Sequence, residues 1–189
     1  MSNTQIDLVY PYVVPDSWVM YADVDSLISW RVSSDVHVIL VFDLQGSVRN
    51  VRPQDLVTLG LDEGAAFDAA GYNLTKAWHA EQFSLGSATL LDGVEIGCAR
   101  GNWMAPAAGL MVGNFYATLS QRLGVSEFIA VAVNQECLFA FPADEQTLAS
   151  KSLRIAMDDE FKGHRKPISR QWLLLNGQWP KQYPGRQLF

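Results

Sequence analysis

Histidines are the first residues to consider for catalysis or metal binding, and this chain has three, His37, His79 and His164. None of them shares a predicted element with another histidine, cysteine or carboxylate at the spacing of a metal site. Asp35 and His37 lie two residues apart on one predicted strand face. This pair could bind a metal, but we interpret it as a polar pair at a strand edge. The sequence therefore predicts no bound metal and no cofactor.

Motifs for nucleophilic or phosphate chemistry are also missing. No Gly-x-Ser-x-Gly elbow is present, and no Ser-x-x-Lys stands in a suitable context. Four glycines resemble a phosphate-binding loop at first sight: Gly86, Gly93, Gly97 and Gly101. The Lys and Ser/Thr of the Walker pattern do not follow them, so they are better explained as turn and bulge glycines. We therefore predict no catalytic residue.

One loop has residues that could hold a small anion. Arg100 and Asn102 precede a predicted helix, whose N-terminal N–H groups attract negative charge. With Glu136 from a nearby turn they form an alternative ligand site, as expected of an enzyme or ligand-binding domain acting on a small molecule. The interpretation that we favour is that Asn102 or Ala105 ends the loop and that Trp103 packs in the core.

The carboxylates of the chain form three local groups. Two of them, Asp62-Glu63 and Asp144-Glu145, stand where predicted helices begin and the helix dipole favours negative charge. The third stands near a helix C-terminus, where the dipole opposes it. We interpret that third group as a partner-facing surface with tryptophans as anchors, although a solvated face explains most charge runs. The predicted contact residues are Asp158, Asp159, Glu160, Trp172 and Trp179.

The charge balance limits the possible partners. The formal net charge is −6, and only 14 of the 189 residues are Lys or Arg. Nucleic acids and anionic membranes attract basic surfaces, so neither is an expected partner. A protein with a basic surface would be attracted.

The two cysteines, Cys98 and Cys137, lie in apolar, strand-like stretches. We interpret them as small buried side chains with reduced thiols, although a disulfide stays open. The first residues, 1–7, carry no signal peptide, and no stretch approaches the roughly 20 apolar residues of a membrane span. The cytoplasm is the expected location.

The elements that position these residues follow from the turns. Turn residues between apolar runs predict four tight turns, at Gln45-Gly46, Asp92-Gly93, Asn134-Gln135-Glu136 and Asn176-Gly177. The strands expected around them cover residues 36–44, 47–51, 83–91, 94–99, 128–133 and 137–141, with a last small hairpin at 172–179. Residues 36–44 are nearly all apolar, which indicates a strand buried on both faces.

Helical periodicity and capping residues predict five helices, at 18–29, 53–60, 62–78, 106–122 and 144–161. The helix at 106–122 has the most regular apolar spacing, with Met111, Phe115 and Leu119 expected to be buried. Residues 5–14 form an extended entry segment, and the tail from residue 180 has no pattern.

Together these features predict an α+β domain over residues 1–189. Hairpins joined by helices favour one antiparallel sheet covered by helices on one face. We expect that sheet to contain residues 36–44, 94–99, 128–133 and 137–141. No repeat, low-complexity segment or long linker divides the chain.

The order of these segments resembles the YtpQ-like family of uncharacterised bacterial proteins over roughly residues 36–150. An apolar strand ends in Asp43, and VRPQDLVTLGLDEGAAFDAAGYNL (residues 51–74) is similar to the family's helix-turn-helix ending in Asn-Leu. A long helix with residues 115–119 and the segment FIAVAVNQECLFAF (residues 128–141) are similar to its later elements. The turn departs from the family pattern, with Asn134-Gln135-Glu136 after Val133 instead of Asn-Arg-Asp after proline. The resemblance implies a fold and a bacterial, cytosolic setting, and no site residues.

The leading functional hypothesis is a non-catalytic, cytoplasmic binding protein of the immunity type, which neutralises a toxin domain through an acidic and aromatic surface. The alternative is the enzyme or ligand-binding domain with its site near Arg100, Asn102 and Glu136. A third possibility is an adaptor or chaperone for a secreted protein.

Overall fold

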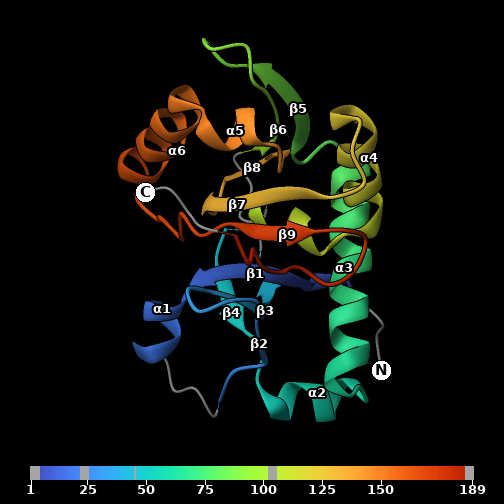
Figure 1. The fold of residues 1–189 in the computed structure, drawn as a ribbon. Coiled ribbons are helices and arrows are strands. Elements are labelled where there is room, and N and C mark those ends of the chain that lie inside the picture. The colour runs from blue at the N-terminus through green and yellow to red at the C-terminus, as the bar shows by residue number, and fades with distance from the viewer. Residues whose placement is uncertain (1–4, 22–25, 45, 102–105, 186–189) are drawn as a thin grey trace.

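The structure is a computed structural model that describes residues 5–21, 26–44, 46–101 and 106–185. It has an α+β fold with two antiparallel sheets, which confirms the predicted fold class. Figure 1 shows the smaller sheet in the lower half of the molecule and the six-stranded sheet above it. The predicted turn residue Gln45 lies outside the described residues. In the described part of the chain, no helix combines the length and the apolar composition that crossing a membrane requires.

The smaller sheet is built around one strand from the predicted central run. Its strands are β1 (Val9–Pro15), β2 (Ser29–Arg31), β3 (Val36–Asp43) and β4 (Val48–Asn50). Strand β3 pairs with β1 along one side and with β2 and β4 along the other. All of its residues except Asp43 are buried, as the apolar run predicts.

The prediction of one sheet is wrong, because β3 shares no ladder with the strands of the larger sheet, β5 to β10. Its partner is β1, which lies in the extended entry segment and contains Pro11 and Pro15. A strand in the middle of a sheet uses its N–H groups to bond neighbours on both sides, and proline has no N–H. An edge strand such as β1 bonds one neighbour only, so it tolerates proline. Hairpin signals in a sequence identify neighbours along the chain and do not identify this distant pairing.

The larger sheet has the strand order β10-β9-β7-β8-β6-β5. Its strands are β5 (Ser84–Thr89), β6 (Glu95–Arg100), β7 (Phe128–Asn134), β8 (Cys137–Pro142), β9 (Leu173–Leu175) and β10 (Lys181–Gln182). The predicted hairpins around Asp92-Gly93 and Asn134-Gln135-Glu136 are present. After Asn176-Gly177 the returning strand starts later than predicted, at Lys181.

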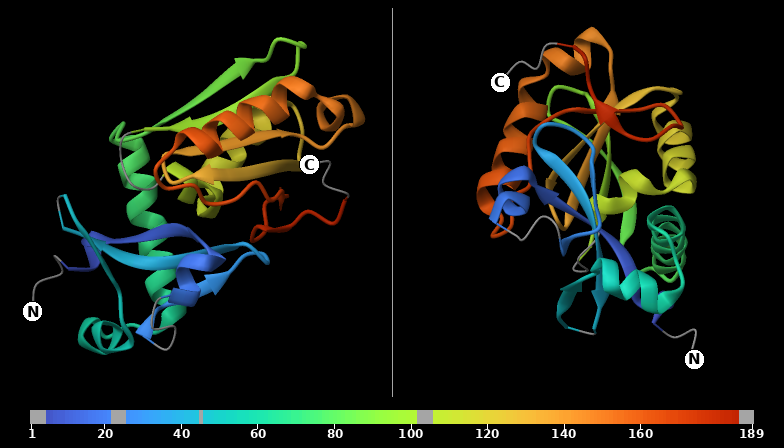
Figure 2. Two further views of the ribbon diagram at one scale, coloured as in Figure 1. Left: turned by 90° about the vertical axis from the view of Figure 1, so that its left-hand side faces the viewer. Right: turned by 90° about the horizontal axis from the view of Figure 1, so that it is seen from below.

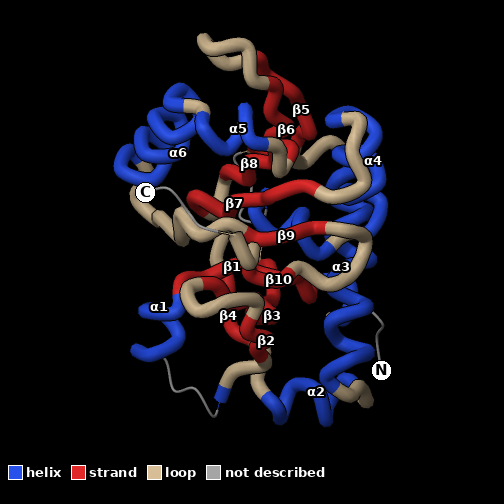
Figure 3. The backbone as a smooth tube through the Cα atoms, in the orientation of Figure 1, coloured by secondary structure: helices blue, strands red, loops and turns tan. Residues whose placement is uncertain are grey.

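Helices cover both faces of the larger sheet, and not one face as predicted (Figure 3). One face packs on η3 (Pro106–Met111) and α4 (Gly113–Leu123), and the other on α6 (Lys151–Gly163). Strand β7 shows why: Phe128, Ala130 and Ala132 face the first layer, and Ile129, Val131 and Val133 face the second. A strand buried on both faces is a continuous apolar run, without the alternation of a one-sided sheet.

The predicted helix at 106–122 is broken in the structure. A 3-10 helix, η3, ends at Met111, Val112 is extended (φ −106°, ψ 116°), and α4 starts at Gly113. A Cβ on Gly109 would lie 2.9 Å from Cζ of Phe115, so the chain folds back on itself and packs the Phe115 ring against this glycine. Phe115 and Leu119 are buried as predicted, whereas Met111 is only partly buried.

Two other predicted helices are also shorter. The helix expected at 18–29 ends at Tyr21 in α1 (Asp16–Tyr21), and Ser29 begins β2. The helix expected at 144–161 is divided into α5 (Glu145–Ala149) and α6, because Ser150 leaves the helical conformation (φ −58°, ψ 122°) and its hydroxyl caps the Leu153 N–H at 3.0 Å. The remaining helices are η1 (Ile6–Leu8), α2 (Pro53–Leu59) and α3 (Glu63–His79), the last two close to their predicted bounds.

Helix α3 runs past both sheets on one side of the molecule (Figure 2). The largest hydrophobic cluster contains Val36 and Val38 of β3 together with Leu74 of α3 and Phe128 of β7. The hydroxyl of Tyr12 on β1 donates a hydrogen bond to the side-chain oxygen of Gln135, in the turn between β7 and β8. The smaller sheet therefore helps to hold the turn that carries part of the candidate site.

Candidate functional site

Three segments that are distant in the sequence meet beside the turn between β7 and β8. They are the end of β6, that turn, and the C-terminal end of α6. We call the two adjoining open depressions between them the polar hollow. Asn134 and Glu136 line one depression, Asp159 lines the other, and Arg100, Glu160 and His164 line both. The part beside Phe139 has a volume of about 400 Å³.

The arginine of the polar hollow is held by an acid on α6. Arg100 is the last residue of β6, and its Nη2 donates to Oε1 of Glu160. Its guanidinium carbon also lies 5.6 Å from the centre of the Phe139 ring. Glu160 comes three residues after the buried Met157, one helical turn along the face that packs on the sheet. The packing of α6 therefore brings a carboxylate over the end of β6.

Asn134 fixes the turn and the end of the helix to each other. This side chain is fully buried, and its Oδ1 accepts from the Glu136 N–H at 2.9 Å. Its Nδ2 donates to the Glu160 carbonyl at 3.3 Å and to the Glu160 Oε2 at 3.4 Å. An amide with all these partners holds Glu136 and Glu160 at one site.

His164 and Glu136 close the outer side of the hollow, with Nε2 and Oε2 3.4 Å apart. The His164 Nδ1 accepts from the Lys166 N–H at 3.0 Å, which leaves Nε2 to donate toward Glu136. The Glu136 side chain is 48 % exposed, so its carboxylate still faces solvent. It is therefore open to a ligand.

The cysteine beneath the hollow is not a nucleophile at neutral pH. Cys137 is buried opposite Arg100 in the ladder of β6 and β8. Burial raises the pKa of this thiol to about 12, although the positive charge of Arg100 acts in the opposite direction. The thiol is therefore protonated near pH 7. Among the described residues, no group of three or more His, Cys, Asp or Glu is arranged to hold a metal ion.

The structure divides the three predicted partner-facing acids. Asp158 pairs with Lys162 and with Arg170, each at 2.6 Å, and the bond from Lys162 is the main cause that lowers the pKa of Asp158. Glu160 pairs with Arg100. The dipole argument does not account for these two acids, because each has a charged partner within the molecule, on α6 or on another element. Asp159 is exposed and lines the polar hollow.

The two predicted aromatic anchors lie in different surroundings. Trp172 is 1 % exposed and packs among Leu153, Met157 and Phe141, so the prediction that it is a surface anchor is wrong. Trp179 is 56 % exposed and meets Trp30 edge-on, with ring centres 4.6 Å apart.

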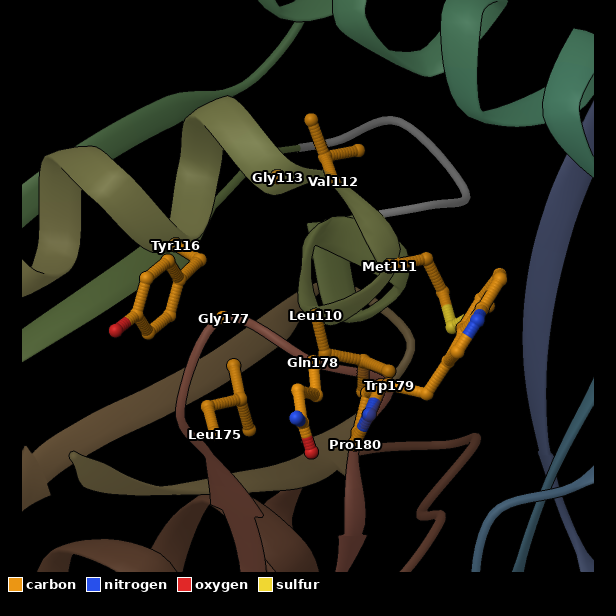
Figure 4. Close-up of a pocket in the computed structure, with 10 residues that line it drawn as sticks. All are labelled: Leu110, Met111, Val112, Gly113, Tyr116, Leu175, Gly177, Gln178, Trp179 and Pro180. Atoms are coloured by element: carbon orange, nitrogen blue, oxygen red, sulfur yellow. The ribbon is translucent and has the colours of Figure 1, made fainter. Parts of the chain in front are cut away.

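Trp179 lines a different pocket from the polar hollow, shown in Figure 4. This pocket has a volume of about 220 Å³ and lies between η3 and the segment that follows β9. Met111 and Tyr116 contribute to its walls from the helical side, and Pro180 from the other.

Of the alternative ligand site, the structure brings Arg100 and Glu136 to one hollow. The other predicted member, Asn102, lies outside the described residues, as does Trp103. The sequence paired His37 with Asp35. In the structure, Nε2 of His37 lies 2.9 Å from Oδ1 of Asp16, at the start of α1.

The sequence did not assign His164 to a site, and it indicated Asn134 only as part of the turn that carries Glu136. Both stand at the end of a secondary-structure element: Asn134 is the last residue of β7, and His164 directly follows α6. Only the fold shows that these two ends meet. The i, i+3 spacing of Met157 and Glu160 was a signal that places Glu160 toward the sheet.

A scan against protein-family models found no match for the chain, and comparisons with curated proteins and with solved structures found none either. The resemblance to the YtpQ-like family therefore stays a prediction from the motifs.

Proposed function

We propose that this protein is a non-catalytic, immunity-type binding protein, and that its polar hollow receives a basic side chain of a partner toxin domain. The observation that carries the proposal is the excess of carboxylates around the two adjoining depressions of the polar hollow. Glu136, Asp159 and Glu160 line it, against one guanidinium, that of Arg100. An ammonium or guanidinium group would find several charged acceptors there.

The charge of the whole molecule supports the same kind of partner. With a net charge of −6, the protein attracts a basic surface before contact and raises the rate of association. Local and long-range charge thus favour the same class of ligand. Because Arg100 is bonded to Glu160, the acceptors left for a cation are Glu136 in one depression and Asp159 in the other.

The chemistry of the hollow favours recognition over catalysis. The Cys137 thiol is buried and protonated, and the Asn134 amide is hydrogen-bonded to the turn and to α6. These groups hold the lining in place, which reduces the entropy that binding costs. Two free cysteines, Cys98 and Cys137, support the cytoplasmic location that belongs to this proposal.

One observation favours a second candidate, the binding of a small cationic ligand in the same place. The volume of about 400 Å³ falls within the roughly 300–1,000 Å³ of small-molecule sites. Such sites are mostly apolar and enclose the ligand, whereas this hollow is charged and open. The protein partner therefore stays the leading proposal.

A titration followed by NMR tests whether the hollow recognises a basic group. The probe is acetyl-arginine methylamide, with the neutral citrulline analogue as its control. The arginine probe should shift the backbone amide signals of Glu136, Glu160, Gly163 and His164, because its guanidinium would approach the Glu136 and Asp159 carboxylates. The citrulline probe should shift none of them.

The double variant Glu136→Gln, Asp159→Asn should abolish these shifts and leave the remaining spectrum in place. Its matched control is Asp68→Asn with Glu127→Gln, which removes two exposed carboxylates elsewhere and changes the net charge equally. Shifts that persist in the first variant, or that appear equally with citrulline, would contradict the proposal.

A further inference from the structure

Along its outer edge, strand β5 of the larger sheet pairs with no other described strand. Among the described strands, β5 pairs only with β6, and the hairpin that they form projects from the end of the molecule away from the smaller sheet (Figure 1). From Ser84 to Thr89 it contains no charged residue and no proline. Ser84, Ser87, Ala88 and Thr89 are exposed.

The hydrogen-bond pattern identifies which backbone groups face outward. The Leu90 N–H donates to the Val94 carbonyl at 2.8 Å, so the pairs that bond toward β6 are those of Ala88, Gly86 and Ser84. The alternate residues, Leu85, Ser87 and Thr89, direct their N–H and C=O groups away from the sheet. Arg122 confirms this direction, because its Nη1 donates to the Leu85 carbonyl at 2.7 Å.

The other described sheet edges carry the usual protection against pairing with another chain. Strand β1 contains Pro11 and Pro15, strands β2 and β4 have three residues each, and β10 has two. Short strands and prolines are the common ways in which proteins block an open edge. Strand β5 has six residues and neither form of protection, and of its outward groups the Leu85 carbonyl is the one that Arg122 bonds.

We propose that β5 is a self-association edge, which pairs antiparallel with β5 of a second copy about a two-fold axis at Ser87. In this register Leu85 faces Thr89 of the second copy, Ser87 faces its equivalent, and Thr89 faces Leu85. All three are outward-bonding pairs, and each exchanges two backbone hydrogen bonds. The Leu85 carbonyl has a second lone pair, so it can accept from the second copy and from Arg122 together.

The composition of β5 fits its own copy. Serine, threonine and leucine side chains meet across the axis without facing like charges, which would destabilise a strand pair. Each molecule carries a net charge of −6, so the two copies repel one another at long range. Added salt screens this repulsion and strengthens the pairing. The effect of salt is therefore opposite to that expected for binding of a basic partner, which added salt weakens.

Sedimentation analysis over a wide concentration range tests the proposal. The wild type should form a dimer as concentration rises, and more readily at higher salt. Ser87→Pro removes an outward N–H and no bond to β6, so it should weaken the dimer at least about tenfold. Ser87→Ala keeps that N–H and is the matched control. It should dimerise as the wild type does.

A second variant keeps the test valid if Ser87→Pro fails to fold. Ser87→Lys keeps the N–H and places two ammonium groups against each other at the axis, so it should also produce monomers, and circular dichroism should show an unchanged fold. A wild type that stays monomeric at every concentration overturns the proposal, as does a dimer that neither variant weakens. The double variant Glu136→Gln, Asp159→Asn tests the polar hollow separately, because it leaves every outward group of β5 in place.

Discussion

Replacing Phe115 with alanine is expected to lower the free energy of unfolding by about 3–5 kcal/mol. The ring is fully buried at the start of α4, packs against Gly109, and lies 5.6 Å from the centre of the Trp78 ring. Its removal takes apolar area from the core and leaves a cavity between η3 and the sheet. Urea unfolding followed by fluorescence gives the difference directly.

Tyr72→Ala is the matched control for that measurement, because it removes an aromatic ring of similar size that is 63 % exposed on α3. We expect its effect to be at most about 1 kcal/mol. A loss below about 1 kcal/mol for Phe115→Ala would contradict the packing described for the break between η3 and α4.

The two tryptophans predicted to be surface anchors, Trp172 and Trp179, are expected to differ sharply in their contribution to the free energy of unfolding. Trp172→Ala should destabilise the protein by about 3–5 kcal/mol, because its ring packs against Phe141 and under α6. Trp179→Ala should cost about 1 kcal/mol or less, since the ring is largely exposed and loses mainly its contact with Trp30. Urea unfolding of both variants makes the comparison, and equal losses would show that the assigned burial is wrong.

Local signals explain the parts of the fold that the sequence predicts correctly. Asp62 caps α3 by accepting from the Ala65 N–H at 2.8 Å, and Gly60 ends α2 with a positive φ of 70°. Gly93 has a φ of 81° in the turn between β5 and β6. Each of these depends on residues next to one another in the chain, which is why a pattern can show it.

The errors come from contacts between distant residues. Nothing in the sequence links β1 to β3, and an edge position is what makes Pro11 acceptable in a strand. The break before α4 depends on the Phe115 ring packing on Gly109, although the apolar spacing alone fits one continuous helix. The break before α6 depends on Ser150, whose hydroxyl also donates to Asp92 at 2.7 Å.

The candidate site also combines residues that local signals identify with a placement that depends on distant contacts. Arg100, Glu136, Asp159 and Glu160 were all selected from the sequence, but for two separate sites. Their meeting depends on α6 packing across the sheet and on Asn134, which bonds to the end of that helix. Charge and turn signals identified the residues, and only the fold could place them together.

The central claim is that the polar hollow binds a basic group of a protein partner. Its most direct test uses the partner protein that this protein captures from the native host. The dissociation constant of the complex is measured at low and at moderate salt, with the wild type and with the double variant Glu136→Gln, Asp159→Asn. We expect the double variant to bind at least about tenfold more weakly, with a smaller salt dependence, because two charged acceptors are lost. Equal affinity and equal salt dependence in the two proteins, or the same loss in the control with Asp68→Asn and Glu127→Gln, would contradict the claim.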